Sequence, residues 1–309
     1  MQGEYNNPRL DLENLYFNNR HYGDMMHDPR FEEAVLDRVK LSLIREINCP
    51  AICCWSMGNE AGYGPNLEKA AEWVKSYDTS VPLQYESSIY YADDYVNDTS
   101  NLDFYSRMYP SPLVLEKYGS TDWGEKPFCC IEYAHCMGNG PGDFEDYWQM
   151  FYKYPKLTGG FAWEWCDHAV KKNGVMHYGG MFGEKNHDGN FCVDGLVSPD
   201  RKVKPGLIEY GNVLRPMRVE DWQKEGDTLK IRVKNYLDFL ALDDAAYLRI
   251  RQFENEDEIK SEVLTAEGLA AGEEKEICFS CDALRPHSFC YVLVESIDKT
   301  DGQIGRASC

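Results

Sequence analysis

Residues 51–60 read AICCWSMGNE, an apolar run that leads directly into Asn59 and Glu60. Residues 128–135 read FCCIEYAH and follow the same pattern, with Glu132 and His135 at the end of the run. Further apolar runs span residues 82–86, 102–109 and 161–165, and helical patterns lie between the runs at 66–77 and 143–154. Near-continuous apolar strands that alternate with helices predict a parallel sheet that is buried on both faces.

The flanking segments indicate two domains. Asp28 and Pro29 are typical of a helix N-cap and first turn, and they predict an amphipathic helix to about Arg45. After residue 215 the strand-like runs 229–233, 246–250, 276–279 and 289–295 are joined by acidic or glycine-containing turns, and no long helix is expected. We predict an α/β domain over residues 1–215 and an immunoglobulin-like β-sandwich over residues 216–309.

Composition excludes several classes of function. The net charge of −20 disfavours binding to nucleic acid or to an anionic membrane surface. The polar start, MQGEYNNPRL, has no apolar core of a signal peptide, and no apolar run is long enough to cross a membrane. Most of the 12 cysteines lie in apolar runs, which favours reduced, buried thiols over a metal site or disulfides. We therefore expect a cytoplasmic protein that acts on a neutral substrate.

The two glutamates carry the chemical argument. In β/α proteins ligands bind beyond the carboxyl ends of the strands, so Glu60 and Glu132 should face the same cleft. Glycoside hydrolysis needs two such carboxyl groups, one to protonate the leaving oxygen and one to attack the anomeric carbon or activate water. Either glutamate alone is better explained as a solvated residue or an ion-pair partner, and it is the occurrence of both at the ends of apolar runs that raises the functional interpretation to equal weight.

Aromatic residues at other strand ends fit a sugar site. Trp163 and Trp165 would share one face of a strand, where a tryptophan ring can contact the C–H groups of a pyranose. Tyr109 ends the run at 102–109 and could hold a hydroxyl near a nucleophile. Core packing explains each of these residues equally well when it is taken singly.

Several motifs in order resemble glycoside hydrolase family 2. Residues 58–64, GNEAGYG, closely resemble the acid/base signature of that family, and residues 132–139, EYAHCMGN, resemble the nucleophile signature of its large β-galactosidase branch. The match continues through residues 159–167, 178–180, 191–196 and 200–201. The resemblance covers roughly residues 28–215 well and the β-rich remainder loosely, and it implies a (β/α)8 barrel.

The resemblance also implies roles for individual residues. Glu60 would be the general acid/base and Glu132 the nucleophile of a retaining β-galactosidase that forms a covalent galactosyl-enzyme. Asn59 would bind the 2-hydroxyl of the sugar, and Tyr109 would contact the nucleophile. His135 would bind sugar hydroxyls and stabilise the transition state, and Trp163 would be the aromatic residue under the galactose. Glu60 would also contact Mg²⁺, and Phe191, through its carbonyl, with Asp194 would help to hold Na⁺.

Two departures from the family pattern are visible. About five of the eight barrel strands are recognisable, roughly strands 4–8, so the leading domains and first strands are expected to be absent. The missing part should carry magnesium's other ligands and several sugar contacts. Residue 194 is Asp where the family usually has Asn, which could alter the sodium site. We expect a homo-oligomer, or assembly with the remainder of a full-length enzyme.

Other functions remain open from the sequence. The chain could be a carbohydrate-binding or structural piece without turnover, or a β-glucuronidase or β-mannosidase of the same family. A glucuronidase would need a basic residue near the sugar carboxylate, and the Tyr-Ala-His that follows Glu132 favours galactose, as in lactose-like substrates. An open five-strand α/β sheet also fits the pattern alone.

Overall fold

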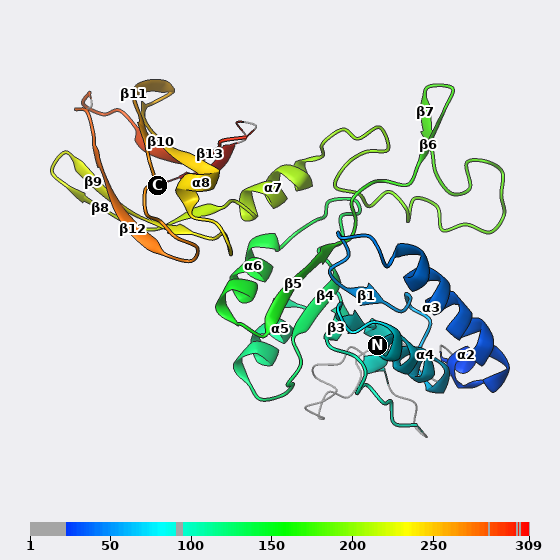
Figure 1. Ribbon diagram of the computed structural model, residues 1–309. Coiled ribbons are helices and arrows are strands. Elements are labelled where there is room, and N and C mark those ends of the chain that lie inside the picture. Colours follow the sequence, from blue (N-terminus) through cyan, green and yellow to red (C-terminus); the bar gives the residue numbers. More distant parts are fainter. Residues whose placement is uncertain (1–22, 91–94, 284, 301, 303, 309) are drawn as a thin grey trace. The chain divides into compact units, whose positions relative to one another are not determined.

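The computed structural model describes residues 23–90, 95–283, 285–300, 302 and 304–308. The chain divides into two compact units, Met1–Gly206 and Leu207–Cys309 (Figure 1). The division falls somewhat before the predicted boundary at residue 215, because the second unit includes most of helix α7 (Pro205–Val213). We describe the two units separately.

The helices predicted over residues 28–45, 66–77 and 143–154 are confirmed, and the first unit contains further helices that were not predicted. Asp28 caps the first predicted helix by accepting a hydrogen bond from the Arg30 amide at 2.9 Å. The helix itself is split into a 3-10 turn, η1 (Pro29–Phe31), and α3 (Glu32–Glu46), which α2 (Asp24–His27) precedes. The other helices are α4 (Pro65–Tyr77), η2 (Glu86–Ile89), α5 (Pro112–Ser120) and α6 (Phe144–Lys153).

Parallel strands form the centre of the first unit. They are β1 (Trp55–Ser56), β2 (Leu83–Gln84), β3 (Tyr105–Met108), β4 (Phe128–Tyr133) and β5 (Leu157–Ala162). β1 pairs with β2, and β4 pairs with β3 on one side and β5 on the other, in parallel throughout. The amide of Asp103 donates to the carbonyl of Leu83 at 2.8 Å, which links the β2 segment to the chain that enters β3. The prediction of a parallel sheet is confirmed for these strands.

The prediction of a strand over residues 161–165 was wrong. β5 begins earlier and ends at Ala162, so Trp163 and Trp165 lie beyond the strand. The reason is local: Gly160 pairs with Cys130, and a Cβ on residue 160 would lie 2.4 Å from the Cys130 carbonyl oxygen. This close approach requires glycine, although glycine lowers the apparent strand propensity. A short hairpin, β6 (Val170–Lys172) and β7 (Val175–His177), follows.

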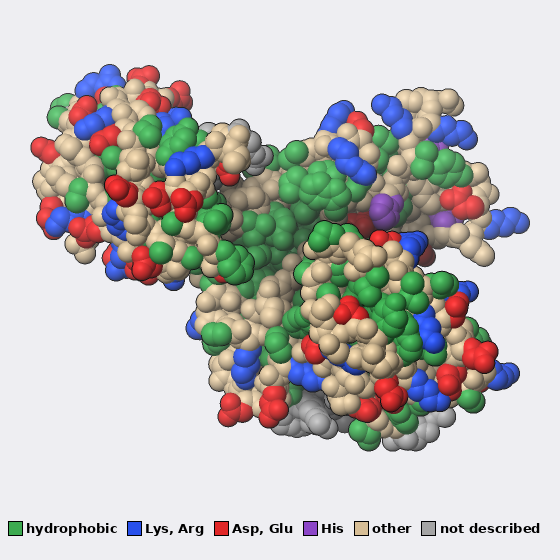
Figure 2. All heavy atoms as spheres, viewed as in Figure 1, with side chains coloured by type: hydrophobic (Ala, Val, Ile, Leu, Met, Phe, Trp, Pro, Cys, Tyr) green, Lys and Arg blue, Asp and Glu red, His purple; other side chains and the backbone are tan. Residues whose placement is uncertain are grey.

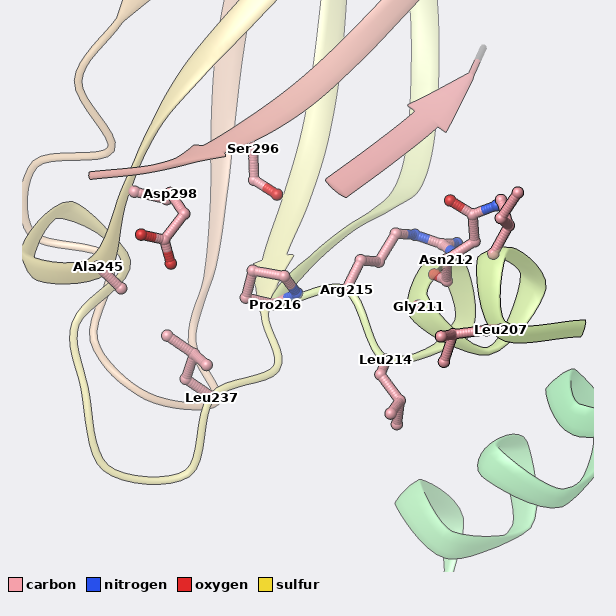
Figure 3. Close-up of a pocket in the computed structure, with 12 residues that line it drawn as sticks. Leu207, Gly211, Asn212, Leu214, Arg215, Pro216, Leu237, Ala245, Ser296 and Asp298 are labelled. Atoms are coloured by element: carbon pink, nitrogen blue, oxygen red, sulfur yellow. Dashed lines mark hydrogen bonds between the residues drawn. The ribbon is translucent and has the colours of Figure 1, made fainter. Parts of the chain in front are cut away.

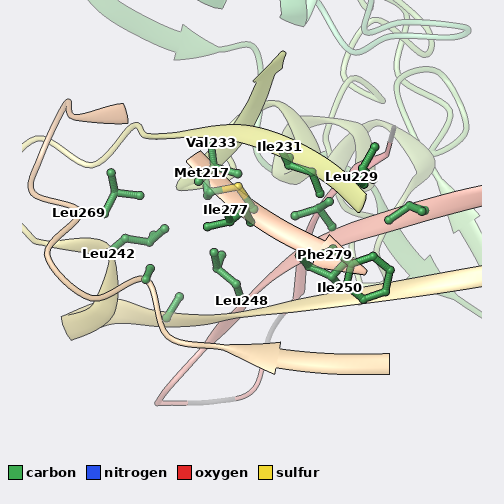
Figure 4. Packing of buried hydrophobic residues seen from close by; sticks show 14 residues of the cluster. Met217, Leu229, Ile231, Val233, Leu242, Leu248, Ile250, Leu269, Ile277 and Phe279 are labelled. Carbon is green, nitrogen blue, oxygen red and sulfur yellow. The ribbon is translucent and has the colours of Figure 1, made fainter. Parts of the chain in front are cut away.

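The second unit is an antiparallel two-sheet structure, as predicted. One sheet has the strand order β11-β10-β13-β14 and the other β12-β9-β8. The strands are β8 (Met217–Glu225), β9 (Thr228–Asn235), β10 (Ala246–Glu254), β11 (Asp257–Leu264), β12 (Glu274–Ser280), β13 (Cys290–Asp298) and β14 (Ile304–Ser308), with the short helix α8 (Leu242–Ala245) before β10. Side chains from both sheets fill the core, among them Ile231, Leu248 and Phe279 (Figure 4).

Surface and composition add few constraints. Acidic and basic side chains are interspersed on the visible face of the second unit (Figure 2). In the described part of the chain, no helix has the length and apolar character needed to cross a bilayer. The described cysteines are free thiols, and Cys130, Cys136 and Cys166 are buried.

Candidate active site

The predicted site residues lie at the carboxyl ends of the parallel strands. Asn59 and Glu60 follow β1, Tyr109 follows β3, and Glu132 is the penultimate residue of β4. Trp163 follows β5 directly. Because the carboxyl ends of parallel strands lie at one edge of a sheet, these residues lie at the same edge of the parallel strands.

Three of these strand ends have an unusual backbone. Glu60, Tyr109 and Ala134 have φ angles of 49°, 48° and 50°, in the left-handed region that residues other than glycine rarely occupy. Each such residue costs about 1–3 kcal/mol, so it persists only where surrounding contacts hold it. Strained positions of this kind concentrate at functional sites, and here they coincide with the ends of β1, β3 and β4.

Glu132 is a largely buried carboxyl group. Its side chain and backbone are only 8% exposed, and the Tyr109 amide donates to the Glu132 carbonyl oxygen at 2.7 Å. Burial raises the pKa of Glu132, the hydrogen bond from the Tyr109 hydroxyl lowers it, and the charges of Glu60 and Glu86 raise it further. Burial and the bond to Glu132 also raise the pKa of Tyr109, so its hydroxyl remains a proton donor.

Glu60 is exposed and is held through its backbone. Its amide donates to Glu86 Oε1 at 2.7 Å, and the next amide, of Ala61, donates to the Tyr85 hydroxyl at 2.9 Å. Both acceptors belong to the segment that follows β2. The charge of Glu60 acts on the pKa values of both Glu132 and Tyr109, so its carboxyl group lies within electrostatic range of the other two. Asn59 is exposed beside it.

Asp194 connects the remaining predicted residues. The Trp163 indole donates to Asp194 Oδ2 at 3.1 Å, and His135 Nε2 lies 3.8 Å from the same oxygen. The His135 ring is 5.7 Å from the Tyr109 ring and 5.6 Å from that of Phe191, centroid to centroid. Tyr109, His135, Phe191 and Trp163 therefore surround one polar centre, whereas Trp165 is 58% exposed.

Two further acidic residues belong to this region and were not singled out from the sequence. Burial and a hydrogen bond with Asp194 raise the pKa of Glu164 to about 7. Glu86 is 1% exposed, and burial raises its pKa. Glu86 ends the apolar run at residues 82–86, much as Glu132 lies at the end of its run, whereas Glu164 lies within the run at 161–165, between Trp163 and Trp165.

Some of the donor atoms named in the metal predictions lie in the described part of the chain, and the predictions themselves stay predictions. Asp194 is 2% exposed, and its Oδ1 has no hydrogen-bond partner within the described residues. A buried carboxylate oxygen of this kind suits a cation, and Phe191 lies in the same region. Within the described ranges, no group of three or more His, Cys, Asp or Glu residues is placed to hold a metal ion, and Mg²⁺ at Glu60 stays a prediction.

A separate pocket of about 480 Å³ lies within the second unit (Figure 3). Leu207, Leu214 and Leu237 line it together with Arg215 and Asp298. It contains no pair of carboxyl groups, and we assign no reaction to it.

Parallel β/α units with carboxyl groups at the strand ends are the arrangement found in barrel-type glycoside hydrolases. Residues 7–219 match the model of the family described as glycosyl hydrolases family 2, TIM barrel domain. The chain belongs to glycosyl hydrolase family 2. The strands that the structure describes do not close into a ring, so they represent part of that barrel.

Similar proteins include several β-galactosidases. The chain is 46% identical over 278 residues to the β-galactosidase of Actinobacillus pleuropneumoniae, a match that covers 90% of this chain and 25% of the relative. It is 42% identical over 229 residues to that of Staphylococcus xylosus, covering 72% of this chain and 23% of the relative. The chain thus spans about a quarter of the length of these relatives.

Solved structures give a more distant match. An FMN-binding β-glucuronidase from Facaelibacterium prausnitzii L2-6 aligns with a TM-score of 0.45 at 14% identity, over 89% of this chain and 44% of the other. A β-glucuronidase from Parabacteroides merdae aligns with a TM-score of 0.46 at 12% identity, over 91% and 38%.

Proposed function

We propose that this chain carries the catalytic carboxyl pair of a retaining β-galactosidase, which hydrolyses terminal β-D-galactosides. The observation that carries the proposal is Glu132, a buried carboxyl group at the end of β4 that is hydrogen-bonded by Tyr109 and lies within the field of Glu60. The similarity to named β-galactosidases supports the choice of sugar.

The proposed reaction has two steps. The Glu132 carboxylate attacks the anomeric carbon while Glu60 donates its proton to the departing oxygen, so the C–O bond to the aglycone breaks and a galactosyl ester forms. Once Glu132 is esterified it has no charge, so Glu60 can carry a negative charge without repulsion from Glu132. Glu60 then removes a proton from water, the water oxygen attacks the anomeric carbon, and Glu132 leaves as a carboxylate.

The other residues would bind and orient the sugar. Asn59 would contact the 2-hydroxyl, Trp163 would lie under the ring, and His135 would bind hydroxyl groups. The hydrogen bond from Trp163 to Asp194 holds the indole in place, and the aromatic neighbours of His135 restrict its ring. We also propose Na⁺ at Asp194 and the Phe191 carbonyl, where it would orient sugar hydroxyls, and Mg²⁺ at Glu60 with ligands outside the described residues.

The charge of the site favours a neutral sugar over a uronide. Glu132, Glu164 and Asp194 are acidic, and a sugar carboxylate placed among them would be repelled. Of the basic residues of this unit, Lys204 is paired with Asp167 at 2.8 Å, and Arg107 is buried, at 3% exposed. β-Glucuronide hydrolysis is therefore the weaker alternative, and comparison of p-nitrophenyl galactoside, glucuronide and mannoside distinguishes the three activities.

The nucleophile is tested by Glu132→Gln. The amide cannot form the glycosyl ester, so turnover should be abolished while the melting temperature changes little. Mass spectrometry after reaction with a 2-deoxy-2-fluoro galactoside should place the label on the peptide that contains Glu132. A label on another residue contradicts the assignment.

The acid/base is tested by Glu60→Ala with azide. Azide should partly restore turnover of an activated aryl galactoside and give the β-galactosyl azide, because azide needs no general base. Rescue of the Glu132 variant with the α-azide as product would reverse the two roles. A crystal structure should show the two carboxyl groups about 5–5.5 Å apart, whereas about 9 Å would indicate inversion.

The alternative of a non-catalytic carbohydrate-binding piece has a direct test. A chromogenic β-galactoside is offered to this chain and, in parallel, to the longest natural protein that contains it. Sugar binding without hydrolysis by either protein favours the alternative.

A further inference from the structure

Two consecutive backbone amides at the end of β1 are bound by two consecutive side chains that follow β2. The Glu60 amide donates to Glu86 Oε1 at 2.7 Å, and the Ala61 amide donates to the Tyr85 hydroxyl at 2.9 Å. The parallel pairing of Trp55 with Leu83 brings the two segments together. The turn that carries Glu60 is therefore fixed by its neighbouring strand.

Glu86 is unusually placed for a carboxyl group. It is 1% exposed, its Oε1 also accepts the Ser87 hydroxyl at 2.6 Å, and its Oε2 is buried without a hydrogen-bond partner among the described residues. A buried carboxyl group with an unsatisfied oxygen destabilises a fold unless another contribution offsets it. The bond to the Glu60 amide is such a contribution.

Glu60 needs this support because of its backbone conformation. Its φ of 49° lies in the left-handed region, although its side chain has a Cβ that disfavours that region. The Glu60 carboxyl group is itself exposed, so contacts of the side chain do not determine the direction of its Cα–Cβ bond. The hydrogen bond from the Glu60 amide to Glu86, together with the one from the Ala61 amide to the Tyr85 hydroxyl, holds the backbone in the orientation observed.

We infer that Glu86 is a positioning residue for Glu60: it holds the acid/base turn in its left-handed conformation through the Glu60 amide. The inference rests on the proposed role of Glu60, and it adds a function for a residue that makes no contact with the reacting atoms. Loss of the acceptor should release the turn and misdirect the Glu60 carboxyl group, and a misplacement of about 1 Å can cost ~100-fold in rate.

Hydrogen exchange on this chain tests the positioning without any need for turnover. In Glu86→Ala the Glu60 amide should exchange at least about tenfold faster, because bonds to charged acceptors are among the stronger protein hydrogen bonds. Glu86→Gln keeps a carbonyl acceptor of the same shape and should restore most of the protection. Ser88→Ala is the matched control, since Ser88 is buried in the same η2 turn but donates to the Tyr85 carbonyl, and it should leave the Glu60 amide unchanged.

Two exchange results would overturn the inference. One is equal exchange of the Glu60 amide in wild type and Glu86→Ala. The other needs no variant: a wild-type Glu60 amide that exchanges as fast as an unprotected amide shows that Glu86 does not hold it.

A kinetic test separates positioning from general destabilisation. In the longest natural protein that contains this chain, Glu86→Ala should slow methyl β-galactoside, which needs proton donation, at least about tenfold more than a 2,4-dinitrophenyl galactoside. Equal slowing of both substrates would show a merely structural role and overturn the inference. If wild type hydrolyses neither substrate, the proposed function fails, and the exchange experiment still decides whether Glu86 positions the turn.

Discussion

Replacement of Tyr109 by Phe isolates the hydrogen bond on the proposed nucleophile. The Tyr109 hydroxyl is bonded to Glu132, and that bond lowers the pKa of Glu132 against the effect of burial. A hydrogen bond to a charged group is worth about 1.5–3 kcal/mol, which corresponds to a loss of roughly 10- to 100-fold in kcat/KM if it is made in the transition state. The phenyl ring remains, so the ring contact with His135 should be retained.

The pH dependence gives a second readout with a defined sign. Glu132 must be ionised to attack, so the acid limb of the kcat/KM profile follows its pKa. Without the Tyr109 hydroxyl that pKa rises, and the acid limb should move to higher pH. The assay is the pH–rate profile of an aryl β-galactoside in the longest natural protein that contains this chain.

Tyr147→Phe is the matched control for this experiment. Tyr147 lies on α6, and its hydroxyl donates to the Pro110 carbonyl at 2.7 Å, one residue beyond Tyr109 but without a carboxylate partner. It should lower stability slightly and leave the acid limb in place. An unchanged rate and acid limb in Tyr109→Phe, or the same loss in both variants, would refute the reasoning.

Three further predictions concern stability and assembly. Phe279 is 0% exposed, so Phe279→Ala should destabilise the second unit by about 3–5 kcal/mol. The loss should be seen as faster hydrogen exchange in β9 and β12. Phe239 is 93% exposed, and Phe239→Ala should change the stability little. Burial disfavours ionisation of Glu295, but hydrogen bonds from Arg251 and Arg249 outweigh it and lower its pKa. The stabilisation by ionised Glu295 is fully present above its pKa in the unfolded chain, about 4.3, and is lost as the pH falls through its lower pKa in the folded protein. Acid unfolding should therefore begin at higher pH in Arg251→Met than in wild type. Coincident acid transitions of the two proteins would contradict this. Finally, β1 and β5 each have one partner among the described strands. This chain alone should therefore self-associate and have little galactosidase activity. A stable monomer in light scattering that turns over substrate at ~1–10³ s⁻¹ would exclude this prediction.

The sequence predicted the strands and helices that have a clear hydrophobic pattern or a capping residue. Apolar runs located β1 to β4, although β1 and β2 are shorter than their runs because only residues 55–56 and 83–84 pair. Helices with a clear cap or apolar face, such as α3 and α4, were placed within a few residues. The run at residue 161 was misplaced because the pairing of β5 with β4 depends on Gly160, whose suitability comes from the Cys130 backbone and not from its own propensity.

The chemistry of the site was predictable only in part. Glu60 and Glu132 stood out because each follows an apolar run and a recognisable motif. Glu86 ends its run in the same way and Glu164 lies within the run at 161–165, but nothing in the sequence tells a carboxyl group that binds a backbone amide from one that faces solvent. Their identification required the 2.7 Å bond to the Glu60 amide and the contact with Asp194.

The left-handed residues explain why a motif alone does not determine such a site. Glycine and asparagine adopt positive φ most readily, yet the strained position after β1 is Glu60 and not its neighbour Asn59. Because the residue type disfavours the conformation, the free energy that maintains it must come from elsewhere in the fold, here from side chains that follow β2. The direction of the proposed acid/base is thus a property of two paired strand ends. A substitution at Tyr85 or Glu86 can therefore alter the chemistry although the motif itself is intact.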